Sequence, residues 1–205
     1  SLQSGRLRVV ATDGHRLALA SRPLPNGAGI GTGIVPRKAV QEVMRVLGVG
    51  EDVEVALVEN QFLLKMPNFL LLARLIEGQF PNYEQVVPKG HPCQLRVSRS
   101  ALAAALRRVS VLSEERTKPV KVLLRPGALR LTASNPELGE AEESLSVDYA
   151  GEEVAIGFNS RYLLDALGAI EADEVVAELK DGLSPGIIRS LEGEEYFCVI
   201  MPMRI

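Results

Sequence analysis

The feature that most constrains this 205-residue chain is an internal repeat. The segment GRLRVVATDG (Gly5–Gly14) matches GALRLTASNP (Gly127–Pro136) at an offset of 122 positions. Further along, IVPRKAVQEVMRVL from Ile34 matches GFNSRYLLDALGAI from Gly157, with the arginines 124 positions apart. Segments that recur in the same order at nearly one spacing indicate two copies of a single structural unit. We therefore expect two related domains.

The boundary between the copies is predicted in the Pro- and Gly-rich stretch VVPKGHP, Val86–Pro92. We expect residues 1–89 to form a partial domain without its opening strands and first helix, and residues 90–205 to form a complete one. In each copy, strand-like runs surround helices that would pack to one side. This pattern favours the α+β class.

Two helices are predicted with their core faces. In the segment after Pro36, Val40, Val43 and Leu47 recur at helical spacing and are expected to be buried. In SRSALAAALRRVSVLS, Ser98 or Ser100 is the expected N-cap. The residues expected to form the core stripe of that helix are Leu102, Ala105, Leu106 and Val109.

The segments that follow, PVKVLLRPGALRLTAS and GEAEESLSVDYAGEEVAIGF, are each predicted to form a pair of strands, with turns at Pro-Gly and Ala-Gly. Together with the remaining runs they give the second copy two helices and about eight strands.

The composition excludes several classes of protein. Hydrophobic residues make up 46% and charged residues 24% of the chain, as in ordinary globular proteins. The net charge is −3, so the chain is not a basic nucleic-acid-binding arm. No apolar run is long enough for a membrane span, and we expect no membrane partner. Cys93 and Cys198 are far apart in strand-like contexts, which predicts buried free thiols in the reducing cytoplasm.

The segment Thr12–Arg16, TDGHR, places an acid, a histidine and a cation between two strand-like runs. Asp-Gly is a common hairpin turn, which suffices as a structural reason for the motif. Asp13 and His15 could instead be a general base with its orienting acid, as in a metal-dependent hydrolase. With two histidines and no metal-ligand spacing, we expect no metal and no cofactor. A hairpin, a binding surface and a catalytic site remain open from these residues alone.

Four separated motifs, VATDGHRLA, GQFPNYEQVVP, FNSRYLLDAL and YFCVIMPMRI, resemble in order and spacing the bacterial sliding clamp, the beta subunit of DNA polymerase III. The resemblance covers the whole chain and implies most of the second and all of the third of three clamp-fold domains. In that fold, helices line the inside of a ring and antiparallel sheets form the outside. It implies a non-catalytic, cytoplasmic processivity factor of DNA replication that encircles double-stranded DNA as a homodimer. Without the first domain, this chain is not expected to close a ring.

The resemblance also implies a hydrophobic groove that binds peptide segments of the DNA polymerase III alpha subunit, the clamp loader and other proteins with a clamp-binding motif. The residues expected to form it are Thr12, Gly14, His15, Arg16, Leu17, Pro81, Gln85, Val86, Val199, Ile200, Met201, Pro202, Met203 and Arg204. Gln85 stands where some family members carry arginine, which predicts a different selection of peptides. An apolar, methionine-containing tail agrees with such a site, because methionine adapts to varied partners.

Two further surfaces follow from the resemblance. Cations on the helices are expected to face DNA and to contact only its phosphates. They are Arg37, Lys38, Arg45, Arg107, Arg108 and Arg161. Val111 lies about 180° from Leu102 around its helix, and with Leu112 it is expected to contact a partner subunit.

Overall fold

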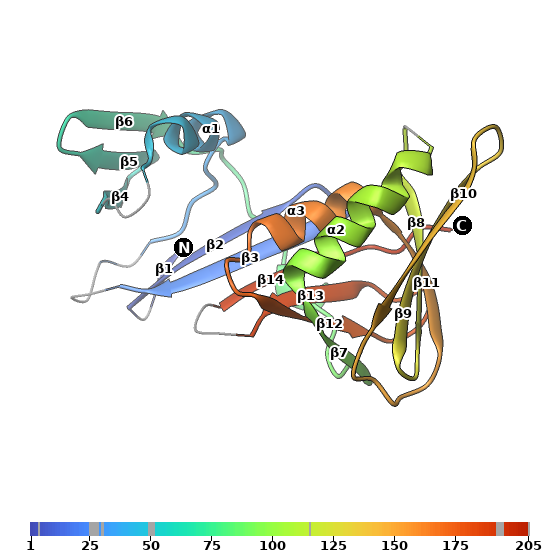
Figure 1. Cartoon of the computed structure of the whole chain (residues 1–205). Coiled ribbons are helices and arrows are strands. Elements are labelled where there is room, and N and C mark those ends of the chain that lie inside the picture. The colour runs from blue at the N-terminus through green and yellow to red at the C-terminus, as the bar shows by residue number, and fades with distance from the viewer. Residues whose placement is uncertain are drawn as a thin grey trace. The chain divides into compact units, whose positions relative to one another are not determined.

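The chain divides into two units, each of which is described by itself (Figure 1). The computed structural model describes residues 1–3, 5–24, 29, 31–48, 52–114, 116–191 and 195–204. Unit 1 comprises Ser1–Arg8 and Pro23–Glu84, and unit 2 comprises Val9–Arg22 and Gln85–Ile205. The hairpin that carries TDGHR therefore belongs to the same unit as the second repeat.

Two antiparallel sheets form the scaffold of unit 2. The larger sheet has the order β1 (Leu2–Gln3), β2 (Arg6–Thr12), β3 (Arg16–Pro23), β14 (Glu195–Ile200), β13 (Gly186–Ser190), β12 (Glu174–Leu179) and β7 (Cys93–Ser98). Of its residues, β1, the first three residues of β2 and the last residue of β3 are assigned to unit 1. The smaller sheet has the order β10 (Gly139–Ser146), β9 (Ala128–Asn135), β8 (Pro119–Arg125) and β11 (Val154–Asn159). Burial alternates along these strands. In β7, for example, Cys93, Leu95 and Val97 are buried and the residues between them are exposed, as a half-buried strand requires.

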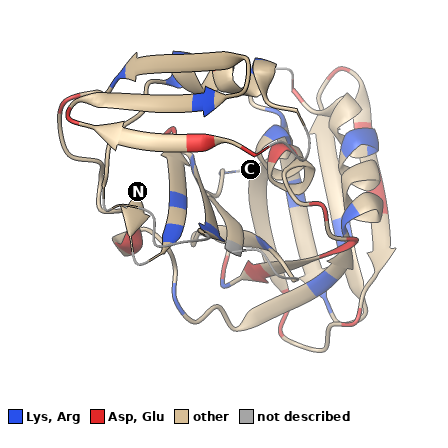
Figure 2. Ribbon diagram, turned by 90° about the vertical axis from the view of Figure 1, so that its left-hand side faces the viewer, with Lys and Arg blue, Asp and Glu red and all other residues tan. Residues whose placement is uncertain are grey.

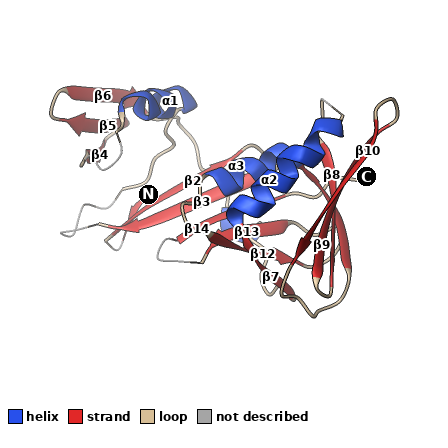
Figure 3. Cartoon of the chain, in the orientation of Figure 1, coloured by secondary structure: helices blue, strands red, loops and turns tan. Residues whose placement is uncertain are grey.

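The helices α2 (Arg99–Val109) and α3 (Ser160–Gly168) lie side by side in unit 2 (Figures 1 and 3). The predicted core stripe of α2 is confirmed, because all four of its residues are buried. Ser98 is the N-cap, and its hydroxyl accepts a hydrogen bond from the Ala101 N–H at 3.4 Å. Apolar side chains from both sheets and both helices form one continuous core. The short 3₁₀ helix η2 (Ser110–Leu112) extends α2.

The Pro-Gly turn between β8 and β9 is confirmed, but the predicted pairing of β10 with β11 is wrong. β10 pairs with β9 and β11 pairs with β8, so β10 and β11 are the opposite edges of the smaller sheet. Their connection crosses the β8–β9 turn, where the Gly127 N–H donates to the Tyr149 carbonyl at 2.8 Å. Gly127 has a φ of 75°, which glycine adopts without strain. Tyr149, which lies in this connection, is buried.

Unit 1 contains a small antiparallel sheet with the order β4 (Glu54–Val58), β5 (Gln61–Met66) and β6 (Phe69–Arg74). The helix α1 (Arg37–Val46) packs against β6, and Tyr83–Gln85 forms the 3₁₀ helix η1. Leu64 on β5 and Ala39 on α1 are buried between the two layers. The packed layer is thin, because few other apolar residues of this unit are fully buried.

The predicted core face of α1 is wrong in part. Val43 is half-buried as expected, but Val40 and Leu47 are exposed, and the buried residue is Ala39. The side of α1 that carries Ala39 and Val43 faces inward because, in the described part of unit 1, the helix packs on the three-stranded sheet. Apolar side chains on its other sides stay in solvent, and Met44 is 74% exposed.

The predicted α+β class is confirmed by antiparallel sheets with helices packed on them. Within its described residues, the second repeat contains two α-helices and the eight strands β7–β14, in agreement with the prediction of two helices and about eight strands. Both cysteines are buried and unpaired, which confirms the prediction for them. Among the described residues, no helix has the length and apolar character needed to cross a membrane.

Candidate functional site

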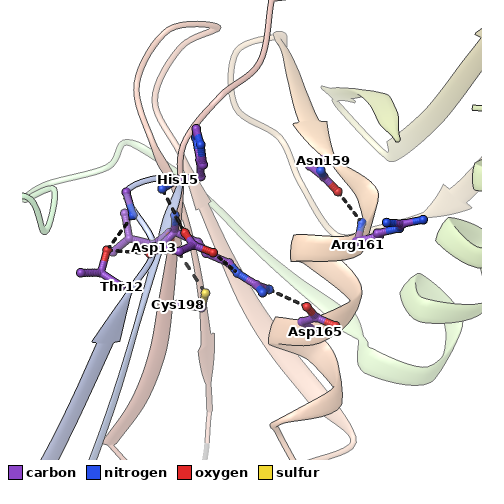
Figure 4. Close-up of polar contacts among 10 residues, drawn as sticks. Thr12, Asp13, His15, Asn159, Arg161, Asp165 and Cys198 are labelled. Carbon is purple, nitrogen blue, oxygen red and sulfur yellow. Dashed lines mark hydrogen bonds and ion pairs between the residues drawn. The ribbon is translucent and has the colours of Figure 1, made fainter. Parts of the chain in front are cut away.

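The turn between β2 and β3 is built by its own side chains (Figure 4). The Asp13 carboxylate oxygen Oδ1 accepts hydrogen bonds from the backbone N–H groups of His15 and Arg16, each at 3.0 Å. Thr12 Oγ1 donates to the Arg16 carbonyl at 2.9 Å and accepts from the Gly14 N–H at 3.2 Å. Gly14 has a φ of 84°, and a Cβ at this position would meet open space. Glycine is therefore needed here for its backbone conformation.

Arg16 ties this turn to the helix α3. Its Nε donates to Asp13 Oδ2 at 3.1 Å, and its Nη1 donates to Asp165 Oδ2 at 2.6 Å. Its guanidinium lies 4.5 Å from the centre of the Tyr162 ring, within the range of a cation–π contact. The His15 ring stacks with the same tyrosine, with 6.4 Å between ring centres and 21° between planes. Two residues of the turn, His15 and Arg16, thus have partners on α3.

These contacts shift the pKa of Asp13. Partial burial alone would raise the pKa of this carboxyl. The backbone hydrogen bonds from His15 and Arg16, with the hydrogen bond and charge of the Arg16 guanidinium, outweigh burial and lower the pKa below its ordinary value. Asp13 is therefore an ionised acceptor that holds the turn in shape.

The C-terminal tail, Val199–Arg204, runs beside this turn. The Met201 N–H donates to the His15 carbonyl at 2.9 Å, and the Met203 N–H donates to the Gly157 carbonyl of β11 at 2.8 Å. Val199 and Ile200 are buried, whereas Met201 is 40% exposed. Pro202 and Met203 are half-buried and Arg204 is exposed. We call Thr12–Leu17, Asn159–Asp165 and Val199–Arg204 the turn–tail cluster.

The turn–tail cluster offers no catalytic pair. The Asp13 carboxylate already accepts hydrogen bonds from two backbone N–H groups and from Arg16, and the His15 ring stacks on Tyr162. Within the part of the chain that the structure describes, no three His, Cys, Asp or Glu side chains are grouped so that they could hold a metal ion. The geometry instead presents half-exposed apolar side chains beside polar groups that are fixed in place, which suits the binding of a partner.

Comparison with known families decides between the remaining alternatives. The model of the DNA polymerase III beta subunit, central domain, matches residues 1–82. The model of the C-terminal domain of the same subunit matches residues 84–204. The chain belongs to the bacterial sliding-clamp family. The resemblance seen in the four motifs is thereby confirmed.

Individual relatives agree with this assignment. The beta sliding clamp of Salmonella typhimurium is 39% identical over 204 residues, which are 99% of this chain and 56% of that relative. The structure of DNA polymerase III subunit beta from Pseudomonas aeruginosa is 36% identical, with a TM-score of 0.91 over 98% of this chain and 56% of that one. The sliding clamp from Bartonella birtlesii, solved bound to griselimycin, is 39% identical, with a TM-score of 0.90 over 98% and 55%.

The sliding-clamp chain therefore spans about half the length of the relatives it matches, and its predicted clamp fold is confirmed. In this family context the remaining predicted site residues can be placed unit by unit. Pro81 belongs to unit 1 and is exposed. Gln85 and Val86 begin the second segment of unit 2 and are also exposed. Leu17 is 5% exposed, so its side chain lies in the interior and is not available on the surface.

The six predicted DNA-facing cations are all exposed, but they differ in their partners. Arg108 on α2 forms a two-point ion pair with Glu143 on β10, at 2.6 and 3.0 Å, which lowers the pKa of Glu143. Arg45 pairs with Glu42 at 2.9 Å. Within the described residues, Arg37, Lys38, Arg107 and Arg161 form no side-chain ion pair. Figure 2 also shows basic residues on strands, so positive charge is not confined to the helices.

The two predicted subunit-contact residues lie on η2, directly after α2. Val111 is 72% exposed, in agreement with its predicted outward direction, and Leu112 is half-buried. The ends of α2 and η2 therefore present an apolar side chain to solvent beside the exposed Arg107 and Arg108. The partner subunit contact itself stays a prediction.

Sequence reasoning missed three residues of the turn–tail cluster. Asn159 is the N-cap of α3 and accepts a hydrogen bond from the Arg161 N–H at 2.9 Å. Tyr162 and Asp165 face Arg16 from the same helix. The motif FNSRYLLDAL contains all three, so an Asn N-cap could have been predicted from it. The contact of Asp165 with Arg16 joins residues 149 positions apart, and no local pattern signals it or the contact of Tyr162.

Behind the cluster, the strand β14 carries two groups whose environment keeps them protonated. Burial raises the pKa of the Cys198 thiol to about 11. Burial likewise raises the pKa of the Tyr196 hydroxyl to about 12. A thiol of such high pKa, buried in the core, is a packing group and not a nucleophile.

Proposed function

We propose that this chain is the partner-binding part of a bacterial sliding clamp, a non-catalytic processivity factor that tethers DNA polymerase to DNA. The turn–tail cluster would bind short peptide segments of replication proteins, among them the DNA polymerase III alpha subunit and the clamp loader. The same surface would bind griselimycin, as the Bartonella birtlesii clamp does. Such a protein would act in the cytoplasm without a cofactor.

One observation carries this proposal. The turn, the start of α3 and the C-terminal tail converge in unit 2. The Met201 N–H bonds to the turn, the Met203 N–H bonds to Gly157 of β11, and the Arg16 side chain bonds to Asp165 on α3. Their apolar side chains stay partly exposed while the backbone is fixed, and such a preformed surface loses little freedom when it binds a ligand. A Leu or Phe anchor buried there would contribute about 1.5–3 kcal/mol. With few other contacts we expect micromolar affinity, or about −8 kcal/mol in total.

The DNA-facing role belongs to the full-length ring. We propose that Arg37, Lys38, Arg107 and Arg161, which form no ion pair within the described residues, contact phosphates there. We also propose that Val111 and Leu112 contact the partner subunit of the homodimer. The 205-residue chain alone is not expected to close a ring. Light scattering at micromolar concentration should therefore show a monomer or a weak association, and a stable closed dimer would contradict the proposal.

The binding proposal is tested by calorimetry with griselimycin and with a short peptide that carries a Leu or Phe anchor. The variant Met201→Ala with Met203→Ala removes two partly exposed side chains, so affinity should fall at least tenfold, or about 1.4 kcal/mol. Leu17→Ala is not suitable, because removing a buried leucine leaves a cavity and destabilises the fold.

The matched control is Leu183→Ala, which removes an 81% exposed apolar side chain from the loop between β12 and β13. Affinity should be unchanged in this control, and circular dichroism should be unchanged in both variants. If the double variant binds both probes as well as the unmodified chain does, the turn–tail cluster is not the binding site.

A further inference from the structure

Asp165 differs from the other acidic residues near α3 because its carboxylate reaches across to the turn. Its Oδ2 lies 2.6 Å from Arg16 Nη1, a short distance even for a charge-assisted hydrogen bond. Asp13 holds the Nε of the same guanidinium at 3.1 Å, and the Tyr162 ring lies 4.5 Å away. Two carboxylates, whose contacts are drawn in Figure 4, and the Tyr162 ring thus fix the plane of one arginine.

The need for a stable fold does not explain this arrangement well. The side chains of Asp165 and Asp13 are 61% and 47% exposed. Exposed ion pairs add little to the free energy of unfolding, because water screens them. Holding a guanidinium in one plane has another effect, because its N–H groups then point in fixed directions. The arrangement is better suited to presenting donors than to stabilising the core.

The count of donors supports this interpretation. A guanidinium has five N–H groups. Within the described residues, Asp13 takes the one on Nε and Asp165 takes one on Nη1. The other donors remain for an acceptor outside the chain. They lie in the turn whose His15 carbonyl is bonded to the tail residue Met201.

We propose that Asp165 is a positioning residue: it holds Arg16 over Tyr162, so that the remaining N–H groups of Arg16 donate to an oxygen of the bound peptide beside its apolar anchor. The inference rests on the proposed function and adds a requirement to it. The ligand must carry an acceptor oxygen next to the Leu or Phe side chain. Asp165 itself does not touch the ligand and acts through Arg16.

The test measures affinity by calorimetry for griselimycin and for the anchor-bearing peptide, in the full 205-residue chain. Asp165→Asn keeps the shape of the side chain and removes its charge, so affinity should fall about five- to tenfold. Asp165→Glu restores the carboxylate and should recover affinity to within about twofold. The control is Asp148→Asn, at an exposed carboxylate for which the described residues provide no polar partner, and it should bind normally.

A double-mutant cycle separates positioning from a direct role. In an Arg16→Ala background, the change Asp165→Asn should have no further effect, because Asp165 has lost the group it positions. The NMR signal of the Arg16 Nε–H should also move in Asp165→Asn, while the melting temperature stays within about 2 °C. Normal affinity in Asp165→Asn, or an undiminished loss in the Arg16→Ala background, overturns the proposal. Failure of the unmodified chain to bind either probe overturns the proposed function instead.

Discussion

The two repeats place the same pattern in different environments. Ala39 and Val43 on α1 stand where the buried Leu163 and Leu167 stand on α3, at the repeat offset of 124. The helix α3 has α2 beside it as well as a strand beneath it, so its apolar face is covered. The helix α1 has β6 as its packing layer, and Met44 is left in solvent. A helical pattern therefore reports which face the complete repeat would bury, while burial itself depends on the layers that are present.

The consequence is a difference in stability between the units. The continuous core of unit 2 draws on both of its sheets and both helices, whereas few apolar residues of unit 1 are fully buried. The turn–tail cluster lies in the unit with the complete core.

The largest expected difference is in amide hydrogen exchange. Protection in β12, β13 and α2 should exceed protection in β4, β5 and α1 by about a hundredfold or more. We expect this difference because unit 1, with its small core, can open while unit 2 stays folded. Mass spectrometry of exchanged peptides measures both regions in one sample. Equal protection in the two sets of elements would show that the units open as one body.

The next largest is the effect of core substitutions. Leu106→Ala removes a fully buried side chain from α2, so it should lower the free energy of unfolding by about 2–5 kcal/mol. Val40→Ala changes an exposed position of α1 and should cost less than about 0.5 kcal/mol. Urea titrations followed by far-ultraviolet circular dichroism report the helices and strands of both units, so they measure both variants. Similar losses in the two variants would contradict the comparison.

A smaller difference is expected between two neighbouring cations of α2 in their effect on the salt dependence of DNA binding. Arg107→Ala should reduce the salt dependence of DNA binding by about one phosphate contact, because this side chain has no ion pair within the described residues. Arg108→Ala should change it less, since Glu143 already compensates the charge of Arg108. Fluorescence anisotropy with duplex DNA at several salt concentrations measures both slopes. Identical slopes for the two variants would mean that the Glu143 ion pair does not govern this surface.

The smallest effect is on acid stability. The pKa of Asp13 is lowered in the folded state, so the ionised carboxylate stabilises the fold above the ordinary pKa, and this contribution is lost as the pH falls through the folded value. Between about pH 5 and pH 3, the melting temperature of Asp13→Asn should fall less steeply than that of the unmodified chain. Scanning calorimetry measures both slopes. The control Asp148→Asn should match the unmodified chain, and a parallel Asp13→Asn curve would contradict the expected role.

Much of the fold could be predicted because its signals are local. The α2 stripe, the Ser98 cap and the turn at Gly127 each depend on residues within a few positions of one another. The failed strand pairing of β10 with β11 depended on a connection that crosses another turn, which no local pattern reveals. The exposed Val40 shows a second limit, since a pattern gives the apolar face but not the layer that covers it.

The candidate site was predictable to a similar degree. The motif TDGHR predicted a hairpin, and its resemblance to the clamp family added a binding surface. The roles of Tyr162 and Asp165 could not be found, because they arise from contacts with Arg16 that only the folded chain brings together. The resemblance placed Leu17 in the groove. The alternation of β3 buries this side chain, and its part in the groove stays a prediction.

We propose that unit 2 carries a preformed partner site in its turn–tail cluster. Hydrogen exchange of the 205-residue chain with and without griselimycin tests this proposal. Added protection should appear in Thr12–Leu17, Asn159–Asp165 and Val199–Arg204, while β4, β5 and β6 exchange as before. If griselimycin binds but protects other segments of the chain, the turn–tail cluster is not the partner site and the account is wrong.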